Sequence, residues 1–124
     1  MATRFLIADE CLIHENYKEK LLKASDVSTM VTGKSMGDAV RCLKTPFSKK
    51  FFKMEYDPAV PKEEVLDFGK GAMRKAVFDG DNMGSYLAGE VAGMIHKKES
   101  AKDIVEDIMG GAEKLLKNAP SLVK

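Results

Sequence analysis

Apolar residues recur every three or four positions along much of the chain, which is the spacing of one face of an α-helix. This spacing predicts helices over 14–24, 35–44, 61–79 (with an interruption at Gly69), 84–97 and 100–118. The last helix is the clearest, because Ser100 can cap its start and Pro120 stops it. The pattern therefore predicts a mainly helical chain of five or six short helices.

The strand content predicted from the sequence is small. The segment 27–32 alternates, is rich in β-branched residues and ends at Gly33, so it is the best strand candidate. The segment 5–8 is too short for periodicity to assign, and 47–61 is expected to be irregular. A single strand has no partner in the chain, and an unpaired strand is unstable alone. The chain is thus expected to be incomplete by itself.

The predicted helix 84–97 has an unusual distribution of small residues. Ala88, Gly89, Ala92 and Gly93 would share one side, where another backbone or a flat ligand could approach closely. Glu90 lies in the middle of this segment. A carboxylate there needs a partner or water. It therefore either faces solvent or pairs with a lysine, or it lines a cavity completed by another part of the protein.

The charge is nearly balanced, with 20 Lys and Arg against 19 Asp and Glu, and this argues against nucleic-acid and membrane partners. The 124 residues, 44% of them hydrophobic, suit one globular domain rather than a disordered chain. No stretch approaches the roughly 18 apolar residues of a membrane span, and the first residues lack a signal-peptide pattern. Cys11 and Cys42 have no metal-binding spacing, so we expect a cytoplasmic protein with reduced thiols.

Local motifs give little catalytic chemistry. Gly33, Lys34 and Ser35 are similar to the end of a phosphate-binding loop, but Ser28 stands where that motif needs its first glycine. A turn before a helix is the better interpretation. The two histidines, His14 and His96, have no carboxylate or thiol partners at ligand spacing. No catalytic residue and no metal site is therefore predicted.

Several strings, taken in order, resemble one enzyme family. They are 3–6, 10–11, 14–18, 37–41 and the small-residue segment 80–95. Together they are similar to the C-terminal portion of the nitronate monooxygenases (2-nitropropane dioxygenases), which include the FMN-dependent enoyl-acyl-carrier-protein reductases II. The resemblance runs from residue 1 to about residue 118.

The resemblance implies part of a TIM-barrel (β/α)8 flavoenzyme. A whole barrel needs about 250 residues, so the chain is expected to be a single partial domain. Its fold class would be mainly α with at most one or two short strands, and the barrel itself would be absent. Residues 1–12 would be the end of a barrel loop at the phosphate site, and residues 13–124 a C-terminal helical portion. The family's catalytic histidine lies upstream, and neither His14 nor His96 matches it.

The resemblance also implies binding residues. Ala2 and Thr3 match the positions that contact the FMN phosphate, although the family usually has glycine at Ala2. Ser85, Gly89 and Glu90 match a substrate pocket, and Glu90 replaces the family's glutamine. FMN is expected only in the complete enzyme and not on this chain alone.

Two functions follow as hypotheses. In the first, the chain completes the FMN phosphate site and covers the pocket when joined to an N-terminal barrel portion. The complete protein would be an FMN oxidoreductase that acts on alkyl nitronates or enoyl thioesters, and this chain would be inactive alone. In the second, it is a non-enzymatic helical remnant or adaptor that self-associates or binds a protein partner. The partner of the small-residue face would discriminate between them.

Overall fold

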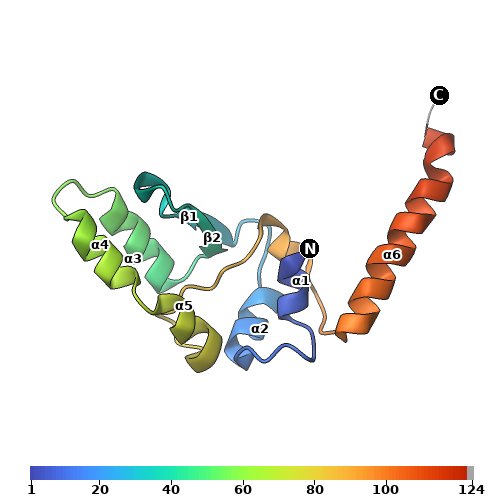
Figure 1. Cartoon of the computed structure of the whole chain (residues 1–124), viewed down its shortest axis with the longest axis horizontal. Helices are drawn as coiled ribbons and strands as arrows, with labels where there is room; N and C mark the ends of the chain where they lie inside the picture. Colours follow the sequence, from blue (N-terminus) through green and yellow to red (C-terminus); the bar gives the residue numbers. More distant parts are fainter. Residues whose placement is uncertain (123–124) are drawn as a thin grey trace.

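The computed structural model describes residues 1–122, so the last two residues of the predicted helical portion lie outside it. Over these residues the chain is mainly helical with two short strands, as the predicted fold class has it, and the two strands form one sheet (Figure 1). Its elements are α1 (Ala2–Leu6), α2 (Glu15–Leu22), β1 (Thr29–Thr32), η1 (Lys34–Met36), β2 (Val40–Leu43), α3 (Pro46–Glu55), α4 (Lys62–Gly69), α5 (Ala72–Arg74), η2 (Lys75–Asp79), η3 (Glu90–Met94), α6 (Ala101–Asn118) and η4 (Ala119–Leu122).

The predicted strand has a partner within the chain. β1 pairs antiparallel with β2, with Thr29 opposite Leu43 and Thr32 opposite Val40. The predicted helix 35–44 is therefore wrong, and so is the expectation of a lone strand. Gly33 explains the difference, because its φ of 77° turns the chain and a Cβ there would lie 2.3 Å from the Asp38 carbonyl oxygen.

The segment predicted to be irregular contains α3, so that prediction is wrong as well. Thr45 caps this helix in a reciprocal capping box with Ser48, and Pro46 occupies the first turn. Phe47 stacks on Phe68 of α4, with ring centroids 5.1 Å apart. The Thr-Pro pair thus starts a helix here and does not stop a preceding one.

The predicted helix 84–97 is also wrong. Residues before Gly89 run extended beside β2, where the Leu43 amide donates to the Tyr86 carbonyl and the Ala88 amide donates to the Arg41 carbonyl. Within the segment 84–97, the short 3-10 helix η3 is the helical part that the structure has. Glycine disfavours helix, and the extended pairing satisfies these backbone groups instead.

The main core lies between α1, α2 and the extended segment beside β2. Tyr86, Ile7 and Leu21 are fully buried there. Tyr17 meets Tyr86 edge to face at 4.8 Å, and its hydroxyl donates to the Leu87 carbonyl oxygen over 2.7 Å. Burial raises the pKa of the Tyr17 phenol, which therefore stays a neutral donor.

Helix α6 was predicted correctly from its periodicity, but it projects away from the rest of the chain (Figure 1). Ser100 caps it as expected by accepting a hydrogen bond from the Asp103 amide. The helix is joined to the body near its first two turns, where Arg4 pairs with Asp107. Within α6, all of which the structure describes, Ile104 is the one buried residue.

Candidate functional site

Thr3 and Gly89, predicted as parts of a phosphate site and a substrate pocket, are in direct contact. Thr3 lies in α1 and is 7% exposed. Its Oγ1 accepts a hydrogen bond from the Gly89 amide over 2.8 Å. A Cβ on Gly89 would stand 3.0 Å from the same oxygen, so the missing side chain permits the approach. The contact joins two segments 86 residues apart in sequence.

The Thr3 hydroxyl keeps a proton that it can donate. A hydroxyl has one donor and two acceptor lone pairs, and the Gly89 amide uses one lone pair. A hydroxyl and nearby backbone amides are a common donor set for a phosphate group. Ala2, the other predicted phosphate contact, is exposed next to Thr3. The residues present therefore suit a phosphate oxygen at this end of α1.

Glu90 faces solvent and pairs with an arginine. Its side chain is 78% exposed, and Oε1 lies 3.5 Å from Nη2 of Arg41. Arg41 is held in place from β2 by donating through Nη1 to the Thr29 hydroxyl over 3.0 Å. Of the two alternatives for Glu90, the structure places it in solvent with a cation beside it, and that cation is an arginine and not a lysine.

Ser85 lies in a different place from Thr3 and Gly89. Its amide donates to the Ala72 carbonyl, and its side chain lines an apolar hollow of about 290 Å³. Phe51 of α3 and Met73 of α5 line the same hollow, whereas Thr3 and Gly89 do not. The structure thus brings Gly89 to Thr3 but leaves Ser85 apart.

The small residues of the segment 84–97 are used within the chain. A Cβ on Gly93 would stand 2.5 Å from the Asp26 amide nitrogen and from the Ser25 carbonyl carbon. Gly89 is approached by Thr3 in the same way. The expectation of a smooth open helical face is therefore wrong, because the segment is not a helix and its own chain makes the close approaches. This feature does not discriminate between the two functional hypotheses.

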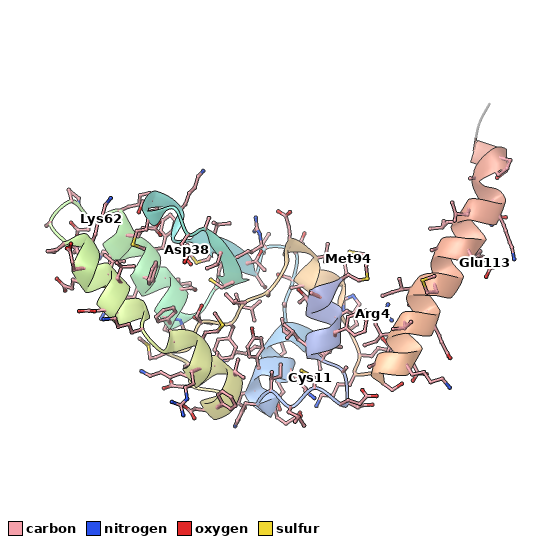
Figure 2. The ribbon with its side chains drawn as sticks, viewed as in Figure 1. Arg4, Cys11, Asp38, Lys62, Met94 and Glu113 are labelled. Atoms are coloured by element: carbon pink, nitrogen blue, oxygen red, sulfur yellow. The ribbon has the colours of Figure 1, made fainter. Side chains whose placement is uncertain are left out.

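A larger apolar pocket, missed in the sequence, opens between α1, η3 and α6. Its volume is about 600 Å³, and Met1, Val91, Met94 and Ile108 contribute to its lining. Figure 2 shows Arg4 and Met94 on neighbouring segments facing the base of α6. The apolar residues Val91 and Met94, shortly before the amphipathic segment of α6, are the sequence signal that could have indicated this pocket; both are exposed in the structure.

The charged edge of this pocket is internally paired. Glu99 accepts from Lys97 and from Arg4, and these hydrogen bonds hold the pKa of the Glu99 carboxyl below its usual value. Arg4 also bonds Asp107 of α6 over 2.7 Å. The pocket therefore presents an apolar floor whose neighbouring charges already have partners.

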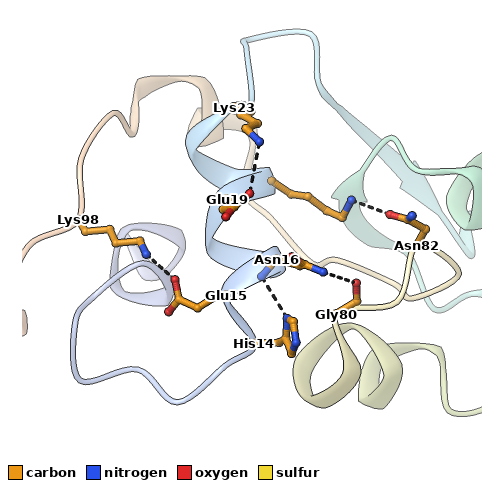
Figure 3. A network of polar contacts seen from close by, with 9 residues as sticks. His14, Glu15, Asn16, Glu19, Lys23, Gly80, Asn82 and Lys98 are labelled. Atoms are coloured by element: carbon orange, nitrogen blue, oxygen red, sulfur yellow. Dashed lines mark hydrogen bonds and ion pairs between the residues drawn. The ribbon is translucent and has the colours of Figure 1, made fainter.

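The histidine His14 has a structural role. It caps α2, and its Nδ1 accepts from the Asn16 amide over 3.1 Å (Figure 3). The imidazole also packs closely on Gly80, where a Cβ would lie 2.2 Å from Nδ1. Among residues 1–122, no group of three or more His, Cys, Asp or Glu side chains could hold a metal ion. In the same part of the chain, no helix has the length and apolarity needed to cross a membrane.

The turn that is similar to a phosphate loop is occupied by a side chain of the protein. The amides of Gly33 and Ser35 donate to the two carboxylate oxygens of Glu55, over 2.8 and 2.7 Å. These are the groups that a bound phosphate would need. The turn interpretation thus accounts for the motif.

Known proteins resemble the chain over nearly all of its length. The family model for nitronate monooxygenase matches residues 1–111. The structure of FabK from Thermotoga maritima superimposes with a TM-score of 0.89 at 34% identity, covering 98% of this chain and 38% of that one. A point mutant of the same FabK gives a TM-score of 0.78 at 32% identity, covering 98% of this chain and 36% of that one. The chain therefore spans little more than a third of the length of FabK.

Proposed function

Because the chain belongs to the nitronate monooxygenase family, we propose that it works as the C-terminal helical portion of an FMN-dependent oxidoreductase. The observation that carries the proposal is the FabK match, which includes 98% of this chain but 38% of the relative. The enzyme would be of the nitronate monooxygenase or enoyl-acyl-carrier-protein reductase II type. The resemblance predicted from the sequence is confirmed at the level of the family.

In this proposal the end of α1 closes the FMN phosphate site. The Thr3 hydroxyl donates to a phosphate oxygen, and the exposed residue Ala2 lies beside it. The Gly89 amide fixes the Thr3 side chain, so the hydroxyl is oriented before FMN binds. FMN supplies the electron transfer, and the protein supplies binding and orientation.

In the same proposal, the segment after Ser85 covers the substrate pocket of the complete enzyme. Gly89 ties this segment to α1, and Glu90 follows immediately at the surface. The Arg41 guanidinium lies beside the Glu90 carboxylate and partly balances the charge that this residue brings in place of the family's glutamine. A substrate that meets this edge therefore meets an ion pair and not an isolated negative charge.

The chain alone is proposed to be inactive. The family's catalytic histidine has no match here, and His14 is engaged as a helix cap.

Within the described residues, Cys11 and Cys42 are free thiols, which supports a reducing compartment such as the cytoplasm.

Complementation tests the proposal. The chain would be co-expressed with the part of Thermotoga maritima FabK that precedes the matched region, and the purified complex examined for flavin absorbance. We expect a yellow complex with the parent chain and a colourless one with Gly89→Leu, since a larger side chain displaces Thr3. Gly110→Leu is the control, because nothing lies within 4 Å of a Cβ there. A colourless parent complex, or equal flavin with Gly89→Leu, would contradict the proposal.

A further inference from the structure

Helix α3 and the residues just before it carry positive charge that the chain does not balance. The stretch 39–54 contains Arg41 and four lysines but no aspartate or glutamate. The lysines are all exposed: Lys44, Lys49, Lys50 and Lys53. Among residues 1–122, none of these four lysines belongs to an ion pair.

Helix α6 shows the more usual arrangement of exposed charges. Lys102 pairs with Glu106, and Lys117 pairs with Glu113, each four residues apart. Each of these lysines therefore has an anion beside it on its own helix. The lysines of α3 are left without such neighbours.

The acidic residue that α3 does contain is engaged elsewhere. Glu55 is the one acid of this helix, all of which the structure describes. Its two carboxylate oxygens accept hydrogen bonds from the amides of Gly33 and Ser35, over 2.8 and 2.7 Å. This carboxylate is thus held at the hairpin turn and does not neutralise the lysines.

Two exposed aromatic rings lie beside the lysines. Phe52 and Tyr56 are 42% and 52% exposed, and their ring centroids are 4.8 Å apart. They are four residues apart, as are Lys49 and Lys53, so helical spacing places the two rows next to each other. The outward side of α3 therefore combines an apolar pair with a basic row. We call this surface the α3 face, and it consists of Lys49, Lys50, Phe52, Lys53 and Tyr56.

The α3 face is separate from the site described above. Figure 1 shows α3 at one end of the molecule and α6 at the other, with α1 between them. No residue of the α3 face lines the apolar pocket between α1, η3 and α6. The two surfaces can therefore be altered independently.

The chemistry of the α3 face favours a protein partner. An apolar centre with a charged rim is typical of protein interfaces, and unpaired lysines on the rim are complemented by carboxylates. A membrane-bound helix inserts its apolar side, but that side of α3 is used within the chain, where Phe47 stacks on α4. A nucleic-acid backbone needs a longer basic track, and the chain beyond Lys53 continues with Glu55 and Asp57.

We propose that the α3 face binds an acidic amphipathic helix of a protein partner. The apolar side chains of that helix cover Phe52 and Tyr56, and its carboxylates pair with Lys49, Lys50 and Lys53. The nearby Lys44 adds to the positive field that attracts such a partner. This interaction goes beyond the proposed function and requires neither FMN nor the barrel.

A helical probe peptide tests the assignment on the full chain. The probe is a fluorescent amphipathic peptide of about 18 residues, with leucines on one side flanked by glutamates, and its counterpart has lysine in place of each glutamate. Fluorescence anisotropy measures the Kd of each peptide. We expect the acidic peptide to bind the parent chain at least about tenfold more tightly than the basic peptide, because carboxylates complement the unpaired lysines.

Two matched double variants locate the binding. Lys49→Gln with Lys53→Gln removes two charges from the α3 face, and Lys102→Gln with Lys117→Gln removes two charges from the paired lysines of α6. We expect the α3 variant to bind the acidic peptide about tenfold more weakly than the parent chain, since two exposed charge pairs are lost. The α6 variant should bind like the parent chain. Circular dichroism checks that both variants keep their helices.

Four results would overturn the assignment. The first two are equal binding of the acidic and basic peptides by the parent chain, and equal binding of the acidic peptide by the two variants. The third is tighter binding of single-stranded DNA or of anionic phospholipid vesicles than of the acidic peptide, since either shows another class of partner. The fourth is loss of peptide binding when the part of Thermotoga maritima FabK that precedes the matched region (the FabK part) joins the chain, because the barrel then covers the α3 face. None of these results affects the proposed function, which flavin complementation tests separately.

Discussion

The body of the molecule, residues 1–100, contains a buried apolar core, whereas the apolar face of helix α6 is mostly exposed. In the body, Tyr86, Ile7 and Leu21 are fully buried against one another. In α6 the strongest periodicity of the chain leads to exposed residues such as Met109 and Leu116. The body is thus held by contacts that the chain itself supplies, and α6 depends for its apolar face on contacts with something else.

The sharpest way to test this difference is to remove one large side chain from each region. Tyr86→Ala should lower the free energy of unfolding of the free chain by about 3–5 kcal/mol, because it empties a fully buried site. Leu116→Ala should change it by no more than about 0.5 kcal/mol. Urea unfolding followed by circular dichroism measures both. A large loss from Leu116→Ala would show that α6 packs on the body in solution.

Two glycines offer the same comparison with an added methyl group. Gly93→Ala should lower the free energy of unfolding by about 1–3 kcal/mol, because its Cβ meets the Ser25–Asp26 backbone at 2.5 Å. Gly110→Ala in α6 should raise the free energy of unfolding by up to about 1 kcal/mol, because the new Cβ meets nothing within 4 Å and alanine favours helix. Chemical denaturation of the two variants measures these values. Changes of the same sign in both variants would show that the two sites do not differ in packing.

The Thr3 hydroxyl can be separated from its packing by a swap of similar shape. In the complex with the FabK part, Thr3→Val should weaken FMN retention by about tenfold, the worth of one hydrogen bond to a charged group. Thr29→Val is the control, because Thr29 is also buried and also accepts a hydrogen bond, from Arg41. Flavin fluorescence during dilution measures release. Equal FMN retention in the two variants would show that the Thr3 hydroxyl does not bind the FMN phosphate.

The smallest expected effect is on how the stability of the chain depends on acidic pH. Hydrogen bonds from Lys97 and Arg4 lower the pKa of Glu99 from its ordinary value of 4.5. The ion pairs therefore contribute stability that is present above this ordinary value and is lost as the pH falls through the lower folded pKa. Between pH 5 and about pH 3, the melting temperature of the parent chain should fall more steeply than that of Glu99→Gln. Glu64→Gln, in α4, is the control and should follow the parent chain. Parallel curves for the parent chain and Glu99→Gln would contradict the prediction.

The sequence predicts those parts of the fold whose periodicity is determined locally. Helix α6 follows from its regular apolar spacing and from Ser100 as its cap. The strand β2 could not be recognised this way, because Met36, Ala39, Val40 and Leu43 also fit helical spacing. The turn at Gly33 decides between the two structures through a close backbone contact that no local pattern contains.

The site depended on other information than the fold. Ala2 and Thr3 follow only from the family resemblance, since nothing in the periodicity of the chain singles them out. The bond between Thr3 and Gly89 joins residues 86 positions apart, and only the folded chain brings them together. The apolar pocket next to them likewise draws on α1, η3 and α6, which are distant in sequence.

The proposed function is tested most directly by recovering the native protein from its own cell through a C-terminal tag and recording its mass, its partners and its flavin absorbance together. We predict a yellow protein, either as a complex with a barrel-sized second chain or as one longer chain that ends in this sequence. A colourless small protein, alone or self-associated, would contradict it.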